Sequence, residues 1–181
     1  MTIGFNHLGR HGRLGNQMFQ YAGLRGIAAH KGYDFAIPPS DFNDEWNDHQ
    51  LFEAFKLTGL TNISEIPGPY VQEAHFHFDQ NLFDNMPDGH NVYAYLQSTK
   101  YFEHIEEEIR EDFEFKNDIH SPCKEMMSTL DKPIALHVRR GDYIQNSDNH
   151  PPCPKEYYDT ALSKFDNNRT VVVFSDDPKW C

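Results

Sequence analysis

Two short apolar runs in the last third of the chain have the pattern of buried parallel strands. The runs cover Ile134–Val138 and residues 170–174, and a helical pattern near residues 155–165 lies between them. A strand that is buried on both faces is almost continuously apolar, and two such strands joined by a helix form a β-α-β unit. The pattern therefore predicts an α/β fold in which both strands end at the same edge of a parallel sheet.

The first two thirds of the chain show weaker periodicities. Residues 33–37 predict a strand, and the acidic, aromatic run 41–49 leads into a helix. Residues 75–78 alternate histidine with phenylalanine, as in a half-exposed strand. An apolar stripe at helical spacing, opposite a face of glutamates, predicts a helix that faces the core. The stripe consists of Phe102, Ile105, Ile109 and Phe113.

Composition narrows the choice of partners. The chain has 181 residues and a formal net charge of −12, which argues against non-specific binding to nucleic acid or to anionic membranes. No apolar run reaches the roughly 18 residues of a transmembrane segment, and no export signal is evident, so we expect a cytoplasmic protein. Three widely spaced cysteines suit reduced thiols better than a disulfide framework or a zinc site.

A glycine-rich segment near the amino terminus is the first candidate for ligand binding. Residues 9–17 carry three glycines together with Arg13 and Asn16, and a helical pattern follows to about His30. Asn16 is the expected cap of that helix, and the glycines permit close approach of a ligand to the backbone. The segment has neither the P-loop nor the dinucleotide spacing. A plain tight connection is the alternative interpretation.

A second candidate follows the first apolar run, where residues 137–143 read His-Val-Arg-Arg-Gly-Asp-Tyr. Guanidinium groups are permanently charged and match phosphoryl oxygens with two parallel donors. Gly141 permits a sharp turn, and Asp142 is placed to orient one of the two arginines. At the carboxyl end of a strand, these groups face the crevice where α/β proteins bind ligands. The alternative is a surface turn with incidental charges.

A third candidate follows the second apolar run. Ser175, Asp176 and Asp177 stand at its carboxyl end, where the carboxylates can accept hydrogen bonds from sugar or ribose hydroxyls. Adjacent residues of a strand point to opposite faces and rarely bind one metal ion together. His75 and His77 lack a third ligand as well. We therefore expect no metal at either place.

Together these segments resemble, in order, motifs of the α-1,2-fucosyltransferases of glycosyltransferase family 11. The resembling segments are residues 12–17, 96–102, 137–142 and 174–180. The resemblance implies a GT-B-like pair of Rossmann-type domains, with GDP-fucose as donor and a galactose-terminated oligosaccharide as acceptor. It also implies inversion at the anomeric carbon without a metal or other cofactor.

The resemblance further implies roles for single residues. Arg139 would hold the diphosphate and neutralise the departing GDP, while Arg13 and Asn16 would reach toward the diphosphate and fucose from the first domain. These three are the expected catalytic residues. The expected GDP-fucose site consists of His137, Arg139, Arg140, Asp142, Ser175, Asp176 and Asp177. No residue is identifiable as the base that activates the acceptor hydroxyl.

The expected domain boundary lies within residues 117–132. Residues 1–125 would form the acceptor-side α/β domain, and residues 126–181 part of the donor-side domain. Members of the family usually continue beyond the Ser-Asp-Asp motif, so we expect an incomplete second domain. Two functions therefore remain open: transfer of fucose to the 2-hydroxyl of a galactoside, or a non-catalytic, truncated remnant or binding module for sugar or nucleotide.

Overall fold

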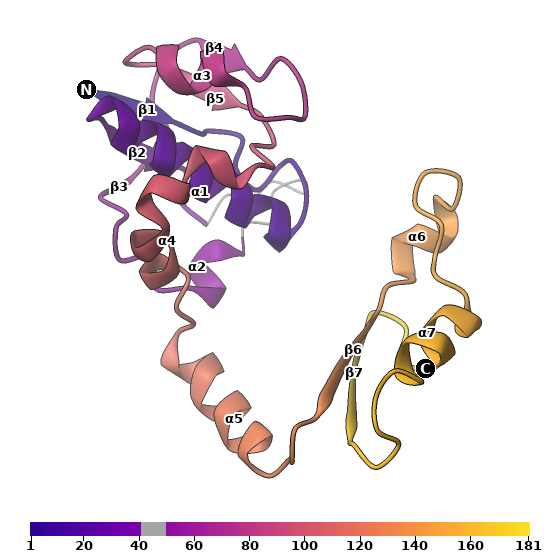
Figure 1. Ribbon diagram of the computed structural model, residues 1–181. Helices are drawn as coiled ribbons and strands as arrows, with labels where there is room; N and C mark the ends of the chain where they lie inside the picture. Colours follow the sequence, from indigo (N-terminus) through magenta and orange to yellow (C-terminus); the bar gives the residue numbers. More distant parts are fainter. Residues whose placement is uncertain (41–49) are drawn as a thin grey trace. The chain divides into compact units, whose positions relative to one another are not determined.

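The computed structural model describes residues 1–40 and 50–181, so the acidic run 41–49 lies outside the described residues. The chain divides into two compact units, Met1–His120 (unit 1) and Ser121–Cys181 (unit 2). Helix α5 (Asn117–Ser128) spans the point of division, within the segment where the boundary was expected. Each unit has its own parallel sheet (Figure 1).

Unit 1 is built on a five-stranded parallel sheet in the order β3-β2-β1-β5-β4. The strands are β1 (Thr2–Gly4), β2 (Asp34–Ile37), β3 (Asn62–Ile63), β4 (Tyr70–Gln72) and β5 (Asn91–Tyr93). Because all five run in the same direction, the loops that follow β1, β4 and β5 leave the same edge of the sheet. This edge is where ligands bind in open α/β folds.

Helix α1 (Leu14–Lys31) is the main partner of this sheet. It contacts β1 and β2 and also reaches α3 and η1. Its side chains Tyr21, Leu24 and Ile27 are fully buried against strand residues such as Ile3 and Ile37. Burial of one large apolar side chain contributes about 1.5–3 kcal/mol, so this helix–sheet contact holds the unit together.

The other helices of unit 1 are short. They are α2 (Leu51–Ala54), α3 (Gln80–Asn85), the 3₁₀ turns η1 (Thr99–Tyr101) and η2 (Glu103–Ile105), and α4 (Glu106–Asp112). The predicted apolar stripe spans η2 and α4: Ile109 is buried, and Phe102 and Phe113 pack against the core. The strand predicted for residues 75–78 is wrong, because this segment forms bends after β4 and Phe76 is 71% exposed.

Unit 2 contains the predicted β-α-β unit. Strands β6 (Ile134–Val138) and β7 (Val171–Ser175) pair in parallel, and α7 (Lys155–Leu162) lies between them in sequence. A further helix, α6 (Gly141–Gln145), follows β6. The expectation that both strands are fully buried is wrong, since Val173 and Phe174 are 43% and 55% exposed. A sheet of two strands offers too little surface to bury its own apolar side chains.

Candidate functional site

The carboxyl ends of β6 and β7 bring two predicted motifs together. The register pairs Val138 with Ser175, so the arginines that follow β6 stand beside the aspartates that follow β7. Six of the predicted donor-site residues are joined here by hydrogen bonds or ion pairs. They are Arg139, Arg140, Asp142, Ser175, Asp176 and Asp177, which we call the arginine cluster.

Arg139 is held between two carboxylates. Its Nη2 lies 2.6 Å from Asp142 Oδ1, and its Nη1 lies 2.7 Å from Asp176 Oδ2. The guanidinium carbon also stands 5.4 Å from the centre of the Tyr143 ring. The prediction that Asp142 orients an arginine is therefore confirmed, and Asp176 is a second positioning partner. The side chain remains 34% exposed, so a ligand can reach it.

Arg140 is fixed by different groups. Its Nε donates to Asp177 Oδ2 at 3.1 Å, and its guanidinium lies 4.2 Å from the centre of the Trp180 ring, within cation–π distance. Its backbone N–H donates to Asp176 Oδ1 at 2.8 Å. This hydrogen bond lowers the pKa of the Asp176 carboxyl below its ordinary value, and the Arg139 charge adds to the effect. Asp176 therefore stays ionised while it braces both arginines.

Gly141 is necessary for this geometry, because it leaves room for the Asp176 carboxylate. Helix α6 begins at this residue. A Cβ atom at Gly141 would lie 2.6 Å from Asp176 Oδ2, closer than van der Waals contact allows. Any larger residue would push Asp176 away from Arg139.

The cluster leaves donors for an anion. A guanidinium carries five N–H groups, and the two carboxylates engage only one side of each terminal nitrogen of Arg139. The remaining N–H groups can donate to phosphoryl oxygens, which match the fork geometry of arginine. His137 lies on β6 and is exposed, and no hydrogen bond or ion pair between described residues joins it to the cluster.

The glycine-rich segment of unit 1 forms a tight loop before α1. Gly12 has a φ of +94°, which favours glycine, and a Cβ atom there would lie 1.9 Å from Asn16 Nδ2. The prediction that Asn16 caps the helix is wrong: α1 begins at Leu14, Arg13 takes the N-cap position, and no side chain caps it. Asn16 instead lies in the first turn, with its side chain folded back over Gly12.

Three glutamines brace this loop, and their roles were not predicted. Gln97 Nε2 donates to Asn16 Oδ1 at 2.7 Å, which joins residues 96–102 to the glycine-rich loop. The buried Gln20 donates to the carbonyl of His11 at 2.9 Å, and the buried Gln17 to that of Gly12 at 3.4 Å. The signal was present in the sequence, because both glutamines lie on the core side of α1 at helical spacing.

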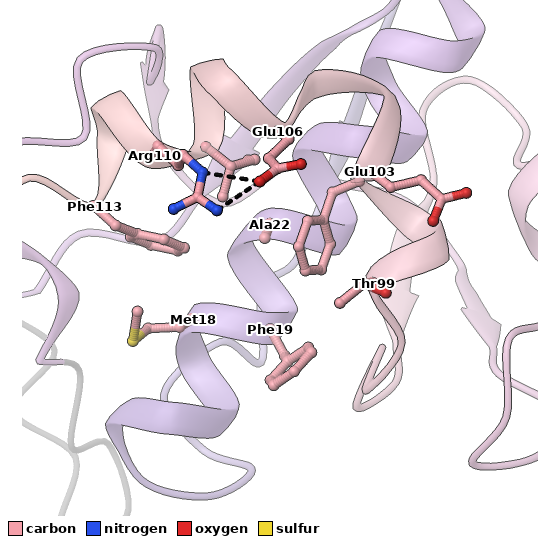
Figure 2. A pocket seen from close by; sticks show the side chains of 10 residues that line it. Met18, Phe19, Ala22, Thr99, Glu103, Glu106, Arg110 and Phe113 are labelled. Atoms are coloured by element: carbon pink, nitrogen blue, oxygen red, sulfur yellow. Dashed lines mark hydrogen bonds and ion pairs between the residues drawn. The ribbon is translucent and has the colours of Figure 1, made fainter.

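A cavity of about 690 Å³ lies in unit 1 between α1 and the η1–α4 segment. Figure 2 shows Met18, Phe19 and Ala22 of α1 on one side and Phe113 on the other, with Arg110 bound to Glu106 at the rim. Its lining is mainly apolar, and its one arginine is already paired with a carboxylate. This cavity contains none of the predicted site residues.

The described residues contain neither a metal-binding cluster nor a helix able to span a membrane. Within residues 1–40 and 50–181, no group of three or more His, Cys, Asp or Glu side chains is arranged to hold a metal ion. Over the same ranges, no helix combines the length and apolar character that a membrane span requires.

Comparison with known proteins decides the family. Residues 2–181 match the family model described as glycosyl transferase family 11. The chain belongs to glycosyltransferase family 11. The resemblance that the motifs suggested is therefore confirmed over nearly the whole chain.

Curated relatives from this comparison are transferases. An α-1,2-colitosyltransferase of Escherichia coli is 25% identical, covering 94% of this chain and 68% of its own length. Galactoside α-(1,2)-fucosyltransferase 2 of Sus scrofa is also 25% identical over 94% of this chain, but over only 53% of its own length. The O-antigen biosynthesis glycosyltransferase WbnK of Escherichia coli is 29% identical, covering 61% of this chain and 41% of its own length. The chain thus spans between about two fifths and two thirds of these relatives.

Solved structures agree with the family at the level of the fold. The fucosyltransferase NodZ from Bradyrhizobium has a TM-score of 0.55 and 13% identity, covering 98% of this chain and 73% of its own. A NodZ α-1,6-fucosyltransferase co-crystallised with GDP gives the same TM-score and identity. The fold of this family 11 chain is therefore an α/β fold with parallel sheets, similar to that of NodZ.

Proposed function

We propose that the chain is the catalytic part of an inverting, metal-independent fucosyltransferase that moves fucose from GDP-fucose to the 2-hydroxyl of a galactoside. The observation that carries the proposal is the arrangement of Arg139 at the end of β6, positioned on both terminal nitrogens by Asp142 and Asp176. Family membership supplies the reaction class, and this arginine supplies the group that the reaction needs.

The chemistry explains why an arginine belongs at this position. When the bond between the fucose C1 and the diphosphate oxygen breaks, GDP takes both bonding electrons and its phosphates gain negative charge. A preorganised cation lowers the energy of this transition state more than that of the ground state. Arg139 is preorganised, because two carboxylates fix its orientation before any ligand arrives. The acceptor oxygen bonds to C1 from the opposite face, and its proton leaves to a base that is not assigned.

The other predicted residues take supporting roles in this proposal. Arg140, stacked on Trp180, and Asp177 shape the same edge of unit 2. We propose that Arg13 and Asn16 of unit 1 act on the diphosphate and fucose of the donor, as residues of a GT-B pair of domains. The relatives named for galactosides and α-1,2 linkage support the acceptor, whereas the neighbour named for α-1,6 transfer makes the linkage the part most in need of a test.

The test is an assay of transfer with the full chain, GDP-fucose and lactose, with and without EDTA. We expect release of GDP and a fucosylated product whose linkage, determined by NMR, is α-1,2, at equal rates in both buffers. Loss of activity in EDTA would contradict metal independence, and a different linkage would contradict the acceptor assignment. Saturable GDP binding without any product from a panel of galactosides would favour the binding-module function instead.

A further inference from the structure

A small pocket of about 270 Å³ lies in unit 1 at the sheet edge where β4 and β5 end. It is formed by the last residue of each of these two strands, by the residues that follow them and by the loop after β1. The lining residues are His11, Gln72, Glu73, Ala74, His75, Phe76, Tyr93, Ala94 and Tyr95. The pocket therefore stands beside the glycine-rich loop, since His11 precedes Gly12 in that loop.

Aromatic rings form much of the wall. The His11 ring stands edge-on to Tyr93, with 4.8 Å between ring centres and an angle of 81° between the planes. Phe76 lies 5.7 Å from Tyr95 and is 71% exposed. An exposed phenylalanine on the rim of a pocket is unusual in a packed loop, because it gains nothing from the core. Its ring offers an apolar surface to whatever enters.

The polar groups of the pocket are held firmly. Glu73 Oε2 accepts from the backbone N–H of Tyr95 at 3.1 Å, and Glu73 Oε1 accepts from the Tyr101 hydroxyl at 3.0 Å. These bonds tie the loop after β4 to the loop after β5, so the wall is preformed. Gln72 and His75 also line the pocket, so its lining mixes apolar rings with hydrogen-bonding residues, and His75 Nδ1 is hydrogen-bonded to the carbonyl of His77 at 3.1 Å.

Two histidines of this region, His7 and His11, have pKa values below the ordinary value, which favours the neutral imidazole. Burial lowers the pKa of His11 below its ordinary value, and the charge of Arg10 adds to the effect. The same two causes, burial first, lower the pKa of His7, whose ring stands edge-on to Tyr93 at 5.3 Å. Neither His7 Nδ1 nor His11 Nε2 has a hydrogen-bond partner among the residues that the structure describes. A neutral imidazole can accept a hydrogen bond from a hydroxyl group.

The size and charge of the pocket exclude phosphate-bearing ligands and nucleotides. None of its nine lining residues is lysine or arginine, so it has no group that pairs with a phosphate. Its volume lies just below the roughly 300 Å³ at which pockets for drug-sized ligands begin, so a nucleoside diphosphate does not fit. What fits is one small, neutral ring with both hydroxyl groups and an apolar face.

We infer that this pocket binds a neutral pyranose ring, stacked on Phe76 and Tyr95 with its hydroxyls on Gln72 and His75. Resting on the proposed function, the ring is the galactose of the acceptor. The sequence predicted only that residues 1–125 form the acceptor side, and this pocket gives the acceptor a defined site within unit 1. It also places the acceptor sugar at the loop that carries Arg13 and Asn16.

The test is an NMR titration of the full, ¹⁵N-labelled chain with methyl β-D-galactopyranoside. We expect saturable shifts of the backbone amides of Ala74 and Ala94, both of which line the pocket. Phe76→Ala should weaken binding roughly two- to tenfold, the range expected for loss of one aromatic contact. The matched control is Tyr157→Ala, which removes a similarly exposed aromatic ring from unit 2 and should leave the affinity unchanged.

Two results would overturn the inference: no saturable shift at Ala74 and Ala94 in the native chain, or equal affinity in Phe76→Ala. A parallel titration with GDP, followed at Asp142 and Asp176, separates this inference from the proposed function. If the chain binds GDP but not the galactoside, the pocket is refuted and the proposed function is not. If it binds the galactoside but not GDP, the pocket is supported and the donor site is refuted.

Discussion

Arg25 with Asp112 in unit 1, and Arg139 with Asp142 and Asp176 in unit 2, are the same chemical pairing in different surroundings. Asp112 is fully buried, and its carboxylate accepts from Arg25, the Tyr21 hydroxyl at 2.6 Å and the backbone N–H of Gly59 at 2.6 Å. Arg139 is one third exposed and keeps N–H groups that neither carboxylate engages. The first pair is saturated and serves stability, whereas the second is positioned and still open to a ligand.

Burial decides which of the two tasks a pair can perform. Loss of one partner of a buried ion pair strongly destabilises the fold, because the other charge is left without solvent or a counter-charge. Burial also raises the pKa of Tyr21 well above its ordinary value, so this hydroxyl stays a donor to Asp112. An exposed pair contributes little to stability, typically below about 1 kcal/mol. Its value lies in the geometry that it gives to a guanidinium.

The largest expected effect comes from breaking the buried pair. Asp112→Ala should lower the free energy of unfolding by about 3–5 kcal/mol, because it leaves Arg25, whose side chain is only 16% exposed, without its counter-charge and leaves the buried Tyr21 hydroxyl without its acceptor. Urea denaturation followed by circular dichroism measures this change. Asp142→Ala is the control from the exposed pair and should cost less than about 1 kcal/mol. A similar loss of unfolding free energy in the two variants would contradict the conclusion that burial decides which pair stabilises the fold.

A smaller free-energy effect, on the affinity for GDP, is expected when the positioning of Arg139 is disturbed. Asp176→Ala removes the partners of both Arg139 Nη1 and the Arg140 backbone N–H, so affinity for GDP should fall about tenfold, or about 1.4 kcal/mol. Isothermal titration calorimetry measures it. Asp142 holds only one nitrogen and is 59% exposed, so Asp142→Asn should weaken binding less. Tighter binding in Asp176→Ala would show that the carboxylate competes with the ligand instead of preparing the site for it.

The smallest expected effect is a difference between the two units in how their stability depends on pH. The pKa values of His7 and His11 are lowered from 6.5 by burial, so the unfolded chain takes up protons at a higher pH than the folded unit does. Their contribution to stability is therefore complete above pH 6.5 and declines as the pH falls toward the folded pKa values. The lowered pKa of Asp176 keeps its contribution until the pH falls below its ordinary value of 3.8.

Amide hydrogen exchange measures this difference between pH 7.5 and 5. Protection of α1 amides should decrease over this range, and the double variant His7→Gln/His11→Gln should show a shallower decrease. Equal slopes in the variant and the native chain would contradict the assignment to these two rings.

The sequence predicted the elements whose signal is local and continuous. The apolar runs of β6 and β7 lie within one residue of the expected bounds, and so does β2, which begins at Asp34. The β-α-β pattern also placed the arginines beside the aspartates, because parallel strands share a carboxyl edge. That step needed only the direction of the strands, and so the arginine cluster could be predicted without a structure.

Contacts between distant segments could not be predicted in this way. Asp112 belongs to a charged run that predicts a solvated face, yet Tyr21 and Arg25, about ninety residues earlier, bury it. Residues 75–78 alternate as a strand does, but no strand among the described residues pairs with them, and this segment forms bends. The pocket at Phe76 depends on three separate loops, which only the parallel sheet brings together.

Calorimetry of GDP binding to the native chain and to Arg139→Ala measures whether Arg139 holds the diphosphate of GDP. Arg110→Ala is the matched control, because Arg110 is an arginine paired with a carboxylate on an exposed helix face of unit 1. We predict saturable binding that prefers GDP to ADP, weakens at least about thirtyfold in Arg139→Ala, and is unchanged in Arg110→Ala. A folded chain that does not bind GDP, or that binds it equally well without Arg139, would contradict this role of Arg139.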